Sequence, residues 1–272
     1  MTECIHGLEL SRCDLCSPKV LPKPDLSTTT TRTRTPRPLA SSTPRRSTAP
    51  ASKTQPLNVS EQRIHHVTHI SNLDGILSSS GLVADASDAR SARPTVDISS
   101  ESNREARRAT FVAGVGSPNI ANYVPFYLSP NASLWEAQRA GSTDPRLSPT
   151  TRGLPASEFV LLVSTVSKVA EAGRGDDNII VADGDAVDPR TRFATSKEAY
   201  DRMLRRVLTD EETSAMLRAE FLAKDTVPFE TITLIGVAND KARDAVKAIL
   251  GSSDYRPRVA VHPPWFALPA DA

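Results

Sequence analysis

Large apolar side chains are spread unevenly along this 272-residue chain, and the change comes at about residue 57. Residues 17–56 are rich in Pro, Ser, Thr and Arg and hold almost no large apolar side chains, so they cannot bury enough surface to offset the entropy of ordering. From residue 57 onward, apolar runs of strand length alternate with segments of helical period. The pattern predicts a flexible linker over 17–56 and one main domain over 57–272.

Short apolar runs rich in β-branched residues mark the expected strands. The runs at 159–163 and 179–182 are apolar throughout and are expected to be buried. Residues 231–237 predict the clearest strand of the chain. Further strands are expected at 63–68, 123–128, 220–223 and 258–261.

Helices are expected between these strands, and the best defined runs over 196–208. Ser196 is its candidate N-cap, and its apolar face holds Tyr200, Met203, Leu204 and Val207. The other expected helices are 72–77, 131–140, 211–217 and 240–250, the last ended by Gly251. Residues 84–119 contain few large apolar groups and are expected to form a long functional or mobile loop.

The formal net charge is +1, but basic side chains are concentrated in the linker. Residues 17–56 carry eight lysines and arginines against one acidic residue, Asp25. Such a segment strengthens nucleic-acid binding in a salt-dependent way when it contacts phosphates. A purely solvated linker explains the composition equally well.

No apolar run approaches the roughly 18 to 20 residues that span a bilayer, and the N-terminus lacks the apolar centre of a signal peptide. The expectation is a soluble, unexported protein with no membrane partner. All three cysteines lie within the first 16 residues, which leaves none to cross-link the main domain. A reducing cytoplasm is therefore the expected location.

The same N-terminal stretch contains a candidate metal site. Cys4, His6, Cys13 and Cys16 have the spacing C-x-H-x6-C-x2-C and are ligands of the kind that tetrahedral zinc takes. The alternative is chance clustering near a disordered terminus. Residues 1–16 are predicted to form a small zinc-binding clip whose folding energy comes from the metal.

Three segments of the main domain carry a resemblance to a known family. They are IHHVTHISNL at 64–73, YVPFYLSP at 123–130 and RAEFLAK at 218–224, and Pro228 and a strand follow the last. In this order they resemble motifs of the DarT family of DNA ADP-ribosyltransferase toxins. The similarity spans roughly residues 62–266 and leaves the N-terminal arm outside.

The resemblance implies a reaction and its partners. In this family NAD is cleaved, ADP-ribose is attached to a base of single-stranded DNA, thymidine in one branch, and a macrodomain antitoxin reverses the modification. The implied fold is α+β, with a twisted central sheet split into two packed halves around an NAD cleft. The chain has no G-x-G-x-x-G fingerprint, so NAD is expected as a substrate rather than a hydride carrier.

Cleavage of the NAD glycosidic bond passes through a cationic transition state, which a carboxylate stabilises. The resemblance assigns that carboxylate to Glu220. It places Arg107 beside Glu220, where it stabilises bound NAD and helps to deprotonate the acceptor base, with Arg104 and Arg108 as alternatives. The remaining implied contacts are with NAD at His66, Thr68, Asn72, Tyr127 and Leu134, and with DNA at Arg104, Arg108 and Asn131.

Departures from the family pattern bear on the acceptor. Asn131 stands where the family has an arginine, and Leu134 stands where it has a methionine. Asp185, within Asp183-Gly184-Asp185-Ala186, stands where Asn or His is more usual. The preference for a target base is therefore left open.

Structural interpretations of the same residues remain beside the functional ones. His65 and His69 are expected to be structural, and the charged cluster at 104–108 would ordinarily be a solvated helix face. The aspartates at 183–188 lack the glutamate that completes a calcium loop. Three function classes remain: a DNA ADP-ribosyltransferase toxin, an ADP-ribosyltransferase acting on RNA or protein, and a non-catalytic nucleic-acid-binding module.

Overall fold

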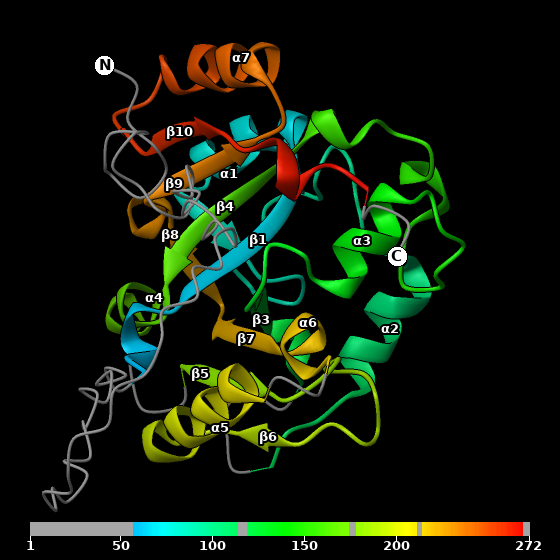
Figure 1. Ribbon diagram of the computed structural model, residues 1–272, viewed down its shortest axis with the longest axis vertical. Coiled ribbons are helices and arrows are strands. Elements are labelled where there is room, and N and C mark those ends of the chain that lie inside the picture. The colour runs from blue at the N-terminus through cyan, green and yellow to red at the C-terminus, as the bar shows by residue number, and fades with distance from the viewer. Residues whose placement is uncertain (1–56, 114–118, 174–177, 211–213, 269–272) are drawn as a thin grey trace, which may run out of the picture. The chain divides into compact units, whose positions relative to one another are not determined.

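The computed structural model describes residues 57–113, 119–173, 178–210 and 214–268 (Figure 1). The candidate zinc ligands Cys4, His6, Cys13 and Cys16 and the linker at 17–56 lie outside these residues, so both remain predictions. Within the described ranges, no helix has the length and apolar character needed to cross a membrane.

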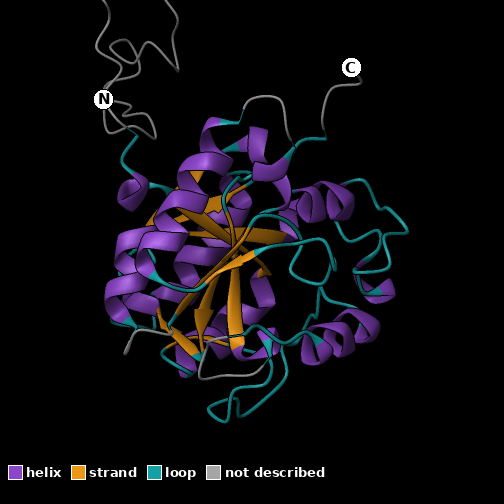
Figure 2. Cartoon of the chain, turned by 90° about the horizontal axis from the view of Figure 1, so that it is seen from below, coloured by secondary structure: helices purple, strands orange, loops and turns teal. Residues whose placement is uncertain are grey.

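An eight-stranded sheet forms the centre of the main domain, with the order β10-β9-β4-β1-β3-β7-β5-β6. All neighbours are antiparallel except β9 and β10. Figure 2 shows the strands at the centre with helices around them. The strands are β1 (Arg63–His69), β3 (Tyr123–Tyr127), β4 (Phe159–Thr165), β5 (Ile179–Ala182), β6 (Phe193–Ala194), β7 (Glu220–Lys224), β9 (Leu234–Val237) and β10 (Arg258–Val261).

The sheet is divided between β1 and β3. β1 pairs with β4 along its whole length, but it pairs with β3 at a single position, His65↔Tyr127. The strands β10-β9-β4-β1 and β3-β7-β5-β6 therefore form two halves joined by one pair (Figure 1). This arrangement confirms the split α+β sheet that the resemblance implied.

A second sheet of two strands was not predicted. It pairs β2 (Gly81–Val83) with β8 (Thr226–Pro228), which follows β7 after one residue, Asp225, at a φ of 54°. A Cβ atom at Gly81 would lie 2.2 Å from the Val227 carbonyl oxygen, so this close approach requires glycine. Three-residue strands are too short to give a clear period-2 signal.

Most expected helices are present, and Ser196 caps the N-terminus of α5 as predicted. The Ser196 hydroxyl accepts a hydrogen bond from the Ala199 amide at 3.3 Å, and the expected face of α5 is buried at Tyr200, Leu204 and Val207. The helices are α1 (Leu73–Ser78), α2 (Glu101–Ala109), α3 (Ser133–Arg139), α4 (Val166–Ala172), α5 (Lys197–Thr209), α6 (Ala215–Arg218) and α7 (Asp240–Leu250).

Two expectations of local structure are wrong. The segment 231–237 is a strand only over β9, because Thr231 ends a 3-10 turn in which the Ile232 amide donates to the Phe229 carbonyl at 3.0 Å. The expected loop at 84–119 contains α2, which begins after Ser100, whose hydroxyl accepts from the Asn103 amide at 3.1 Å. α2 lacks apolar periodicity, so the hydrophobic pattern gave no sign of it.

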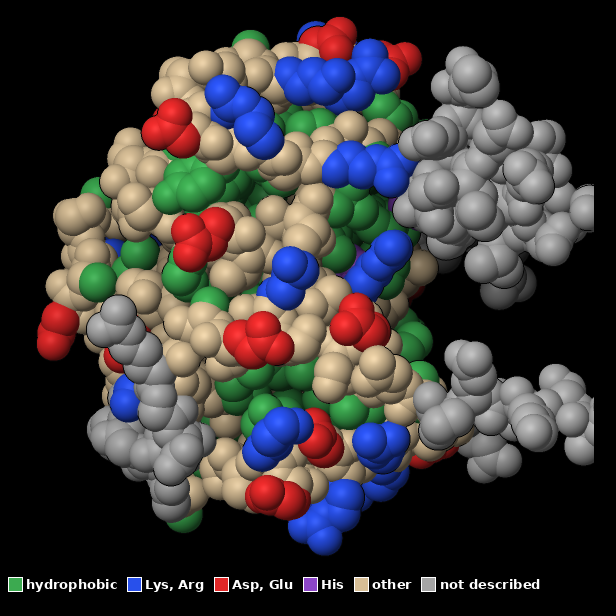
Figure 3. All heavy atoms as spheres, turned by 90° about the vertical axis from the view of Figure 1, so that its left-hand side faces the viewer, with side chains coloured by type: hydrophobic (Ala, Val, Ile, Leu, Met, Phe, Trp, Pro, Cys, Tyr) green, Lys and Arg blue, Asp and Glu red, His purple; other side chains and the backbone are tan. Residues whose placement is uncertain are grey.

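The expected burial of the apolar runs is confirmed. Every side chain from Phe159 to Val163 and from Ile179 to Ala182 is buried. On the face shown in Figure 3, which includes the sheet edge at β10, acidic and basic side chains are interspersed around apolar ones. Charge on that face is therefore mixed rather than of one sign.

Trp265 packs directly over the backbone of β9. A Cβ atom at Gly236 would lie 2.5 Å from Cζ3 of Trp265. The Trp265 carbonyl accepts a hydrogen bond from the Trp135 indole at 2.7 Å, which fixes the C-terminal segment against α3. The contact leaves no room for a side chain at position 236.

We expect Gly236→Ala to lower the free energy of unfolding by about 1–3 kcal/mol through overpacking. Gly75→Ala is the matched control, because it lies within α1 with no atom within 4 Å of the new Cβ. That change is expected to raise the free energy of unfolding by about 0.5–1 kcal/mol. Urea unfolding measures both, and equal effects of the two substitutions would contradict the packing argument.

Candidate functional site

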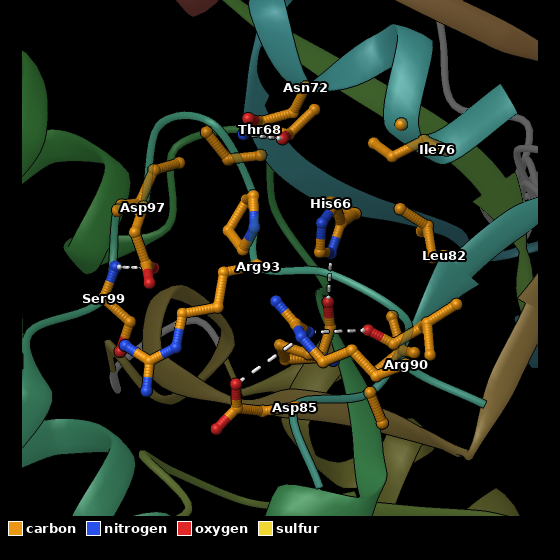
Figure 4. Close-up of a pocket in the computed structure, with 18 of the residues that line it drawn as sticks. His66, Thr68, Asn72, Ile76, Leu82, Asp85, Arg90, Arg93, Asp97 and Ser99 are labelled. Atoms are coloured by element: carbon orange, nitrogen blue, oxygen red, sulfur yellow. Dashed lines mark hydrogen bonds and ion pairs between the residues drawn. The ribbon is translucent and has the colours of Figure 1, made fainter. Parts of the chain in front are cut away.

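A cavity of about 460 Å³ lies where β1 and β3 separate. Its wall is completed by α1, by α2 and by residues 81–99. Figure 4 shows Thr68 and Asn72 at one end, Asp85 and Arg90 at the other, and His66 between them. The volume lies within the range of about 300–1,000 Å³ that is usual for small-molecule sites.

A smaller hollow adjoins this cavity and contains Glu220. Asn103, Arg107, Tyr127 and Leu134 line both spaces and form the wall between them. The hollow is also lined by Ser133, Arg146, Asp185 and Arg218. A molecule in the large cavity and one in the hollow would therefore meet at these shared residues.

Glu220 begins β7 and is held from two directions. Its side chain is 5% exposed. One carboxylate oxygen accepts from Nη1 of Arg107 at 3.0 Å, and the other accepts from the Ala186 amide at 2.9 Å. The carboxylate therefore has a fixed orientation in a largely dry environment, as electrostatic stabilisation of a developing cation requires.

Arg107 reaches Glu220 from the last turn of α2. Burial alone would lower the pKa of Arg107, but the Glu220 carboxylate outweighs that effect and raises it. The guanidinium is permanently charged and cannot accept a proton, so any help with deprotonation is electrostatic. Among the described residues, Nη2 of Arg107 is buried without a hydrogen-bond partner, so its N–H groups are available to a ligand.

Tyr127 ends β3 directly opposite Glu220 in the sheet. Burial raises the pKa of Tyr127, and the nearby Glu220 charge raises it further. The phenol is therefore neutral over the physiological range. It presents a flat ring and one hydroxyl at the boundary between the two spaces.

His66 points into the large cavity (Figure 4). Its Nδ1 lies 2.8 Å from the Pro125 carbonyl oxygen, and because a carbonyl only accepts, Nδ1 carries the hydrogen. Burial lowers the pKa of His66, so the ring is neutral and Nε2 has an acceptor lone pair. A ligand hydroxyl or amide N–H is the matching donor.

Thr68 and Asn72 line the same cavity, but the Asn72 amide is occupied. Its nitrogen donates to Thr68 Oγ1 at 3.1 Å and to the Val96 carbonyl at 2.8 Å, and its oxygen accepts from the Val96 amide at 2.9 Å. Asn72 thus holds the segment around Val96 over the cavity. Direct contact of Asn72 with NAD stays a prediction.

The charged cluster at 104–108 is not the solvated helix face that its composition suggested. The Arg104 side chain is 6% exposed and forms ion pairs with Asp85 and Asp97. Arg108 is 40% exposed and donates to Asp85 at 2.7 Å. Arg104 is therefore engaged inside the protein, whereas Arg108 and the exposed Asn131 remain open to a partner.

Arg146 is a site residue that the sequence did not reveal. It donates to both carboxylate oxygens of Asp144, at 3.0 and 2.6 Å, and also to Asp185. These contacts hold the Arg146 guanidinium beside Glu220, and its positive charge balances the negative charge of Asp185. Arg146 belongs to no recognisable motif, so only the fold brings it to the site.

His65 and His69 make structural contacts, as expected. His65 Nδ1 lies 3.3 Å from the Tyr127 carbonyl oxygen, and its ring meets Trp265 edge-on. His69 Nδ1 lies 2.8 Å from the Ser71 hydroxyl. The residues that the structure describes contain no cluster of three or more His, Cys, Asp or Glu side chains suited to a metal ion.

The split sheet and the buried Arg107–Glu220 pair beside a large cavity agree with the fold and site expected of an ADP-ribosyltransferase. A family model described as "ssDNA thymidine ADP-ribosyltransferase, DarT" matches residues 65–267. The chain therefore belongs to the DarT family. A DNA ADP-ribosyl transferase from Thermus aquaticus is 29% identical over 209 residues, which cover 75% of this chain and 88% of that protein.

Solved structures agree with this assignment of the fold. Thermus sp. 2.9 DarT in complex with ADP-ribosylated ssDNA gives a TM-score of 0.64 at 24% identity, covering 76% of this chain and 97% of that chain. The same protein in complex with NAD+ gives 0.60 at 23% identity, covering 76% and 98%. Thermosipho africanus DarTG in complex with ADP-ribose gives 0.57 at 17% identity, covering 75% and 51%.

The burial of His65 leads to a pH prediction. Burial lowers the pKa of His65 to about 4, below the ordinary 6.5, so the folded state favours the neutral ring. Its contribution to stability is complete above pH 6.5 and is lost as the pH falls towards 4. Between pH 7 and 5, we expect the wild type to lose about 2 kcal/mol more unfolding free energy than His65→Gln.

Urea unfolding at the two pH values measures this difference. His66 is present in both proteins, so its own titration cancels. Equal losses in the wild type and in His65→Gln would contradict the assignment of the effect to His65.

Proposed function

We propose that this chain transfers ADP-ribose from NAD to a base of single-stranded DNA, with thymidine as the first candidate. The observation that carries the proposal is the Arg107–Glu220 pair, which lies at the junction of the large cavity and the hollow. Membership of the DarT family supports the reaction class. The DNA-bound Thermus structure supports single-stranded DNA as the acceptor.

The large cavity is the proposed NAD site. We assign the Nε2 lone pair of His66 and the Thr68 hydroxyl to ribose or carboxamide groups, and Tyr127 and Leu134 to the nicotinamide ring. The support is that all four residues line the cavity. In this arrangement the nicotinamide ribose lies against the Arg107–Glu220 pair, at the boundary between the two spaces. The Thermus DarT complex with NAD+ supports NAD as the substrate.

The proposed step exchanges one bond for another at C1 of the nicotinamide ribose. The C1–nicotinamide bond breaks, and its electron pair leaves on the nicotinamide nitrogen. Glu220 stabilises the positive charge that develops on the ribose. The acceptor nitrogen then bonds to C1, and its proton passes to the Glu220 carboxylate. Arg107 stabilises the negative charge that builds on the base as that proton leaves.

The hollow on the other side of Glu220 is the proposed acceptor site. In a thymidine the only ring N–H is at N3, on the edge used for base pairing, so a duplex would hide it. Leu134 forms an apolar wall of this site, and Arg146 offers a fixed, planar donor group. Arg108 and Asn131 remain the candidates for contacts with the DNA strand.

The biological role we propose is that of a toxin controlled by a macrodomain antitoxin. The likeness to Thermosipho africanus DarTG supports this context. The alternatives from other classes are an ADP-ribosyltransferase acting on RNA or protein and a non-catalytic nucleic-acid binder. The intact ion pair at Glu220 favours an active enzyme over the binder.

We expect Glu220→Gln to abolish transfer, with a fall in rate of at least about 100-fold, because the amide keeps the shape but loses the charge. Glu230→Gln is the matched control, because this exposed glutamate lines neither space, and it should keep full activity. Purified protein is incubated with NAD and single-stranded oligonucleotides that differ at one base. Intact mass then reports the gain of one ADP-ribose.

Each outcome of this experiment selects one function class. Modification that depends on Glu220 and on thymidine supports the proposal in full. NAD consumption without DNA modification moves the acceptor to RNA or protein. No NAD consumption by the wild type favours the binding module.

A further inference from the structure

The helix that carries Arg107 is attached to the protein almost entirely by polar contacts. α2 has the sequence ESNREARRA, and its single buried residue is Arg104. Within the described part of the chain, none of its nine residues joins a hydrophobic cluster. In the described structure α2 therefore adds no side chain to the apolar clusters, whereas apolar packing fixes most helices in globular proteins.

Asp85 holds α2 through hydrogen bonds from two of its arginines. Its carboxylate accepts from Arg104 and, at 2.7 Å, from Nη2 of Arg108. These two arginines are four residues apart, so they project from one face of α2. Arg90 approaches the same carboxylate at 3.8 Å from the wall of the large cavity (Figure 4).

The backbone around Asp85 is anchored to the strand that carries Glu220. The Ala84 amide donates to the Asp225 carbonyl at 2.8 Å, and Asp225 directly follows β7. The Ala86 amide donates to the Ala121 carbonyl at 2.9 Å, just before β3. Asp85 thus connects α2 to the same frame that fixes Glu220.

We propose that Asp85 is a positioning residue, which docks α2 so that Arg107 meets Glu220 in the geometry that transfer requires. The inference rests on the proposed function. Without the carboxylate, Arg104 and Arg108 lose the acceptor that they share. Arg104 then keeps only Asp97, and Arg108 keeps only Glu101, which belongs to α2 itself and cannot dock the helix. α2 then shifts, and Arg107 shifts with it.

The size of the effect follows from the geometry of the site. A displacement of about 1 Å in a catalytic group lowers the rate by up to about 100-fold. The effect falls on kcat, because Asp85 acts through Arg107 at the reacting centre. An Asp85 that bound NAD directly would instead raise KM with kcat unchanged.

We expect Asp85→Asn to lower kcat for transfer to single-stranded DNA by about 10- to 100-fold, with at most a threefold change in KM for NAD. Asp85→Glu, which keeps the charge, should recover part of the rate. Asp201→Asn is the matched control: this aspartate is similarly half-buried, at 26% exposure against 22% for Asp85, and pairs with Lys197 on α5. It should leave kcat unchanged.

A double-mutant cycle separates positioning from a general loss of stability. In the Arg107→Lys background, Asp85→Asn should lower the rate by less than about threefold, because the residue through which it acts is already altered. Labelled NAD and incubations of several hours allow the low transfer rates of the slow variants to be measured. Additive losses, or a rise in KM alone, would overturn the proposal.

Two further results keep the test decisive. If Asp85→Asn does not fold, Arg108→Gln removes one of the two arginine contacts and should lower kcat at saturating DNA by a smaller factor. A rise in KM for DNA with kcat unchanged would mean that Arg108 serves DNA binding alone, and would overturn the proposal. If the wild type itself transfers nothing to DNA, the proposed function fails first. An active wild type with an equally active Asp85→Asn protein refutes the positioning role alone.

Discussion

The ion pair between Arg107 and Glu220 is the interaction on which the rest of the site depends. Each partner is largely removed from water, so neither charge is tolerable without the other. Loss of one partner from such a pair costs about 3–5 kcal/mol, because the remaining charge is left buried. The Ala186 amide donates a hydrogen bond to Glu220, and α2 carries Arg107 to the pair. The two contacts give the carboxylate a fixed orientation, which is the property that the proposed transfer step requires.

The divided sheet makes room for this pair. β1 and β3 join at one residue pair, and the cavity opens where further pairs would otherwise form. Tyr127 lies at the join, opposite both His65 and Glu220. Tyr127 therefore forms the one pair between β1 and β3 and also lines both spaces of the site. A core strand on each side is fully buried, over 159–163 in one half and over 179–182 in the other.

Among the residues that the structure describes, ion pairs fix the side chains around the two spaces where no apolar cluster does so. Asp85, Arg104 and Arg108 hold α2, and Asp144 and Asp185 hold Arg146. Sequence patterns could not predict these contacts, because an arginine in a polar segment has the same local signature whether it is solvated or buried. For this reason the sequence left a solvated face and a functional cluster at 104–108 as alternatives. Leu134 was recognisable only through the family motif, although it lines both spaces.

Local elements and motif residues could be predicted from the amino-acid sequence. Apolar runs and end signals such as Ser196 depend on neighbours within a few residues, so they can be read along the chain. The family motifs predicted that Glu220, His66 and Tyr127 belong to one site, and the fold brings these residues to two adjoining spaces. Three features came from the tertiary structure instead: which arginine reaches Glu220, where the sheet divides, and the position of Arg146 beside the carboxylate. Those features depend on contacts between segments far apart in the chain, and local patterns do not record them.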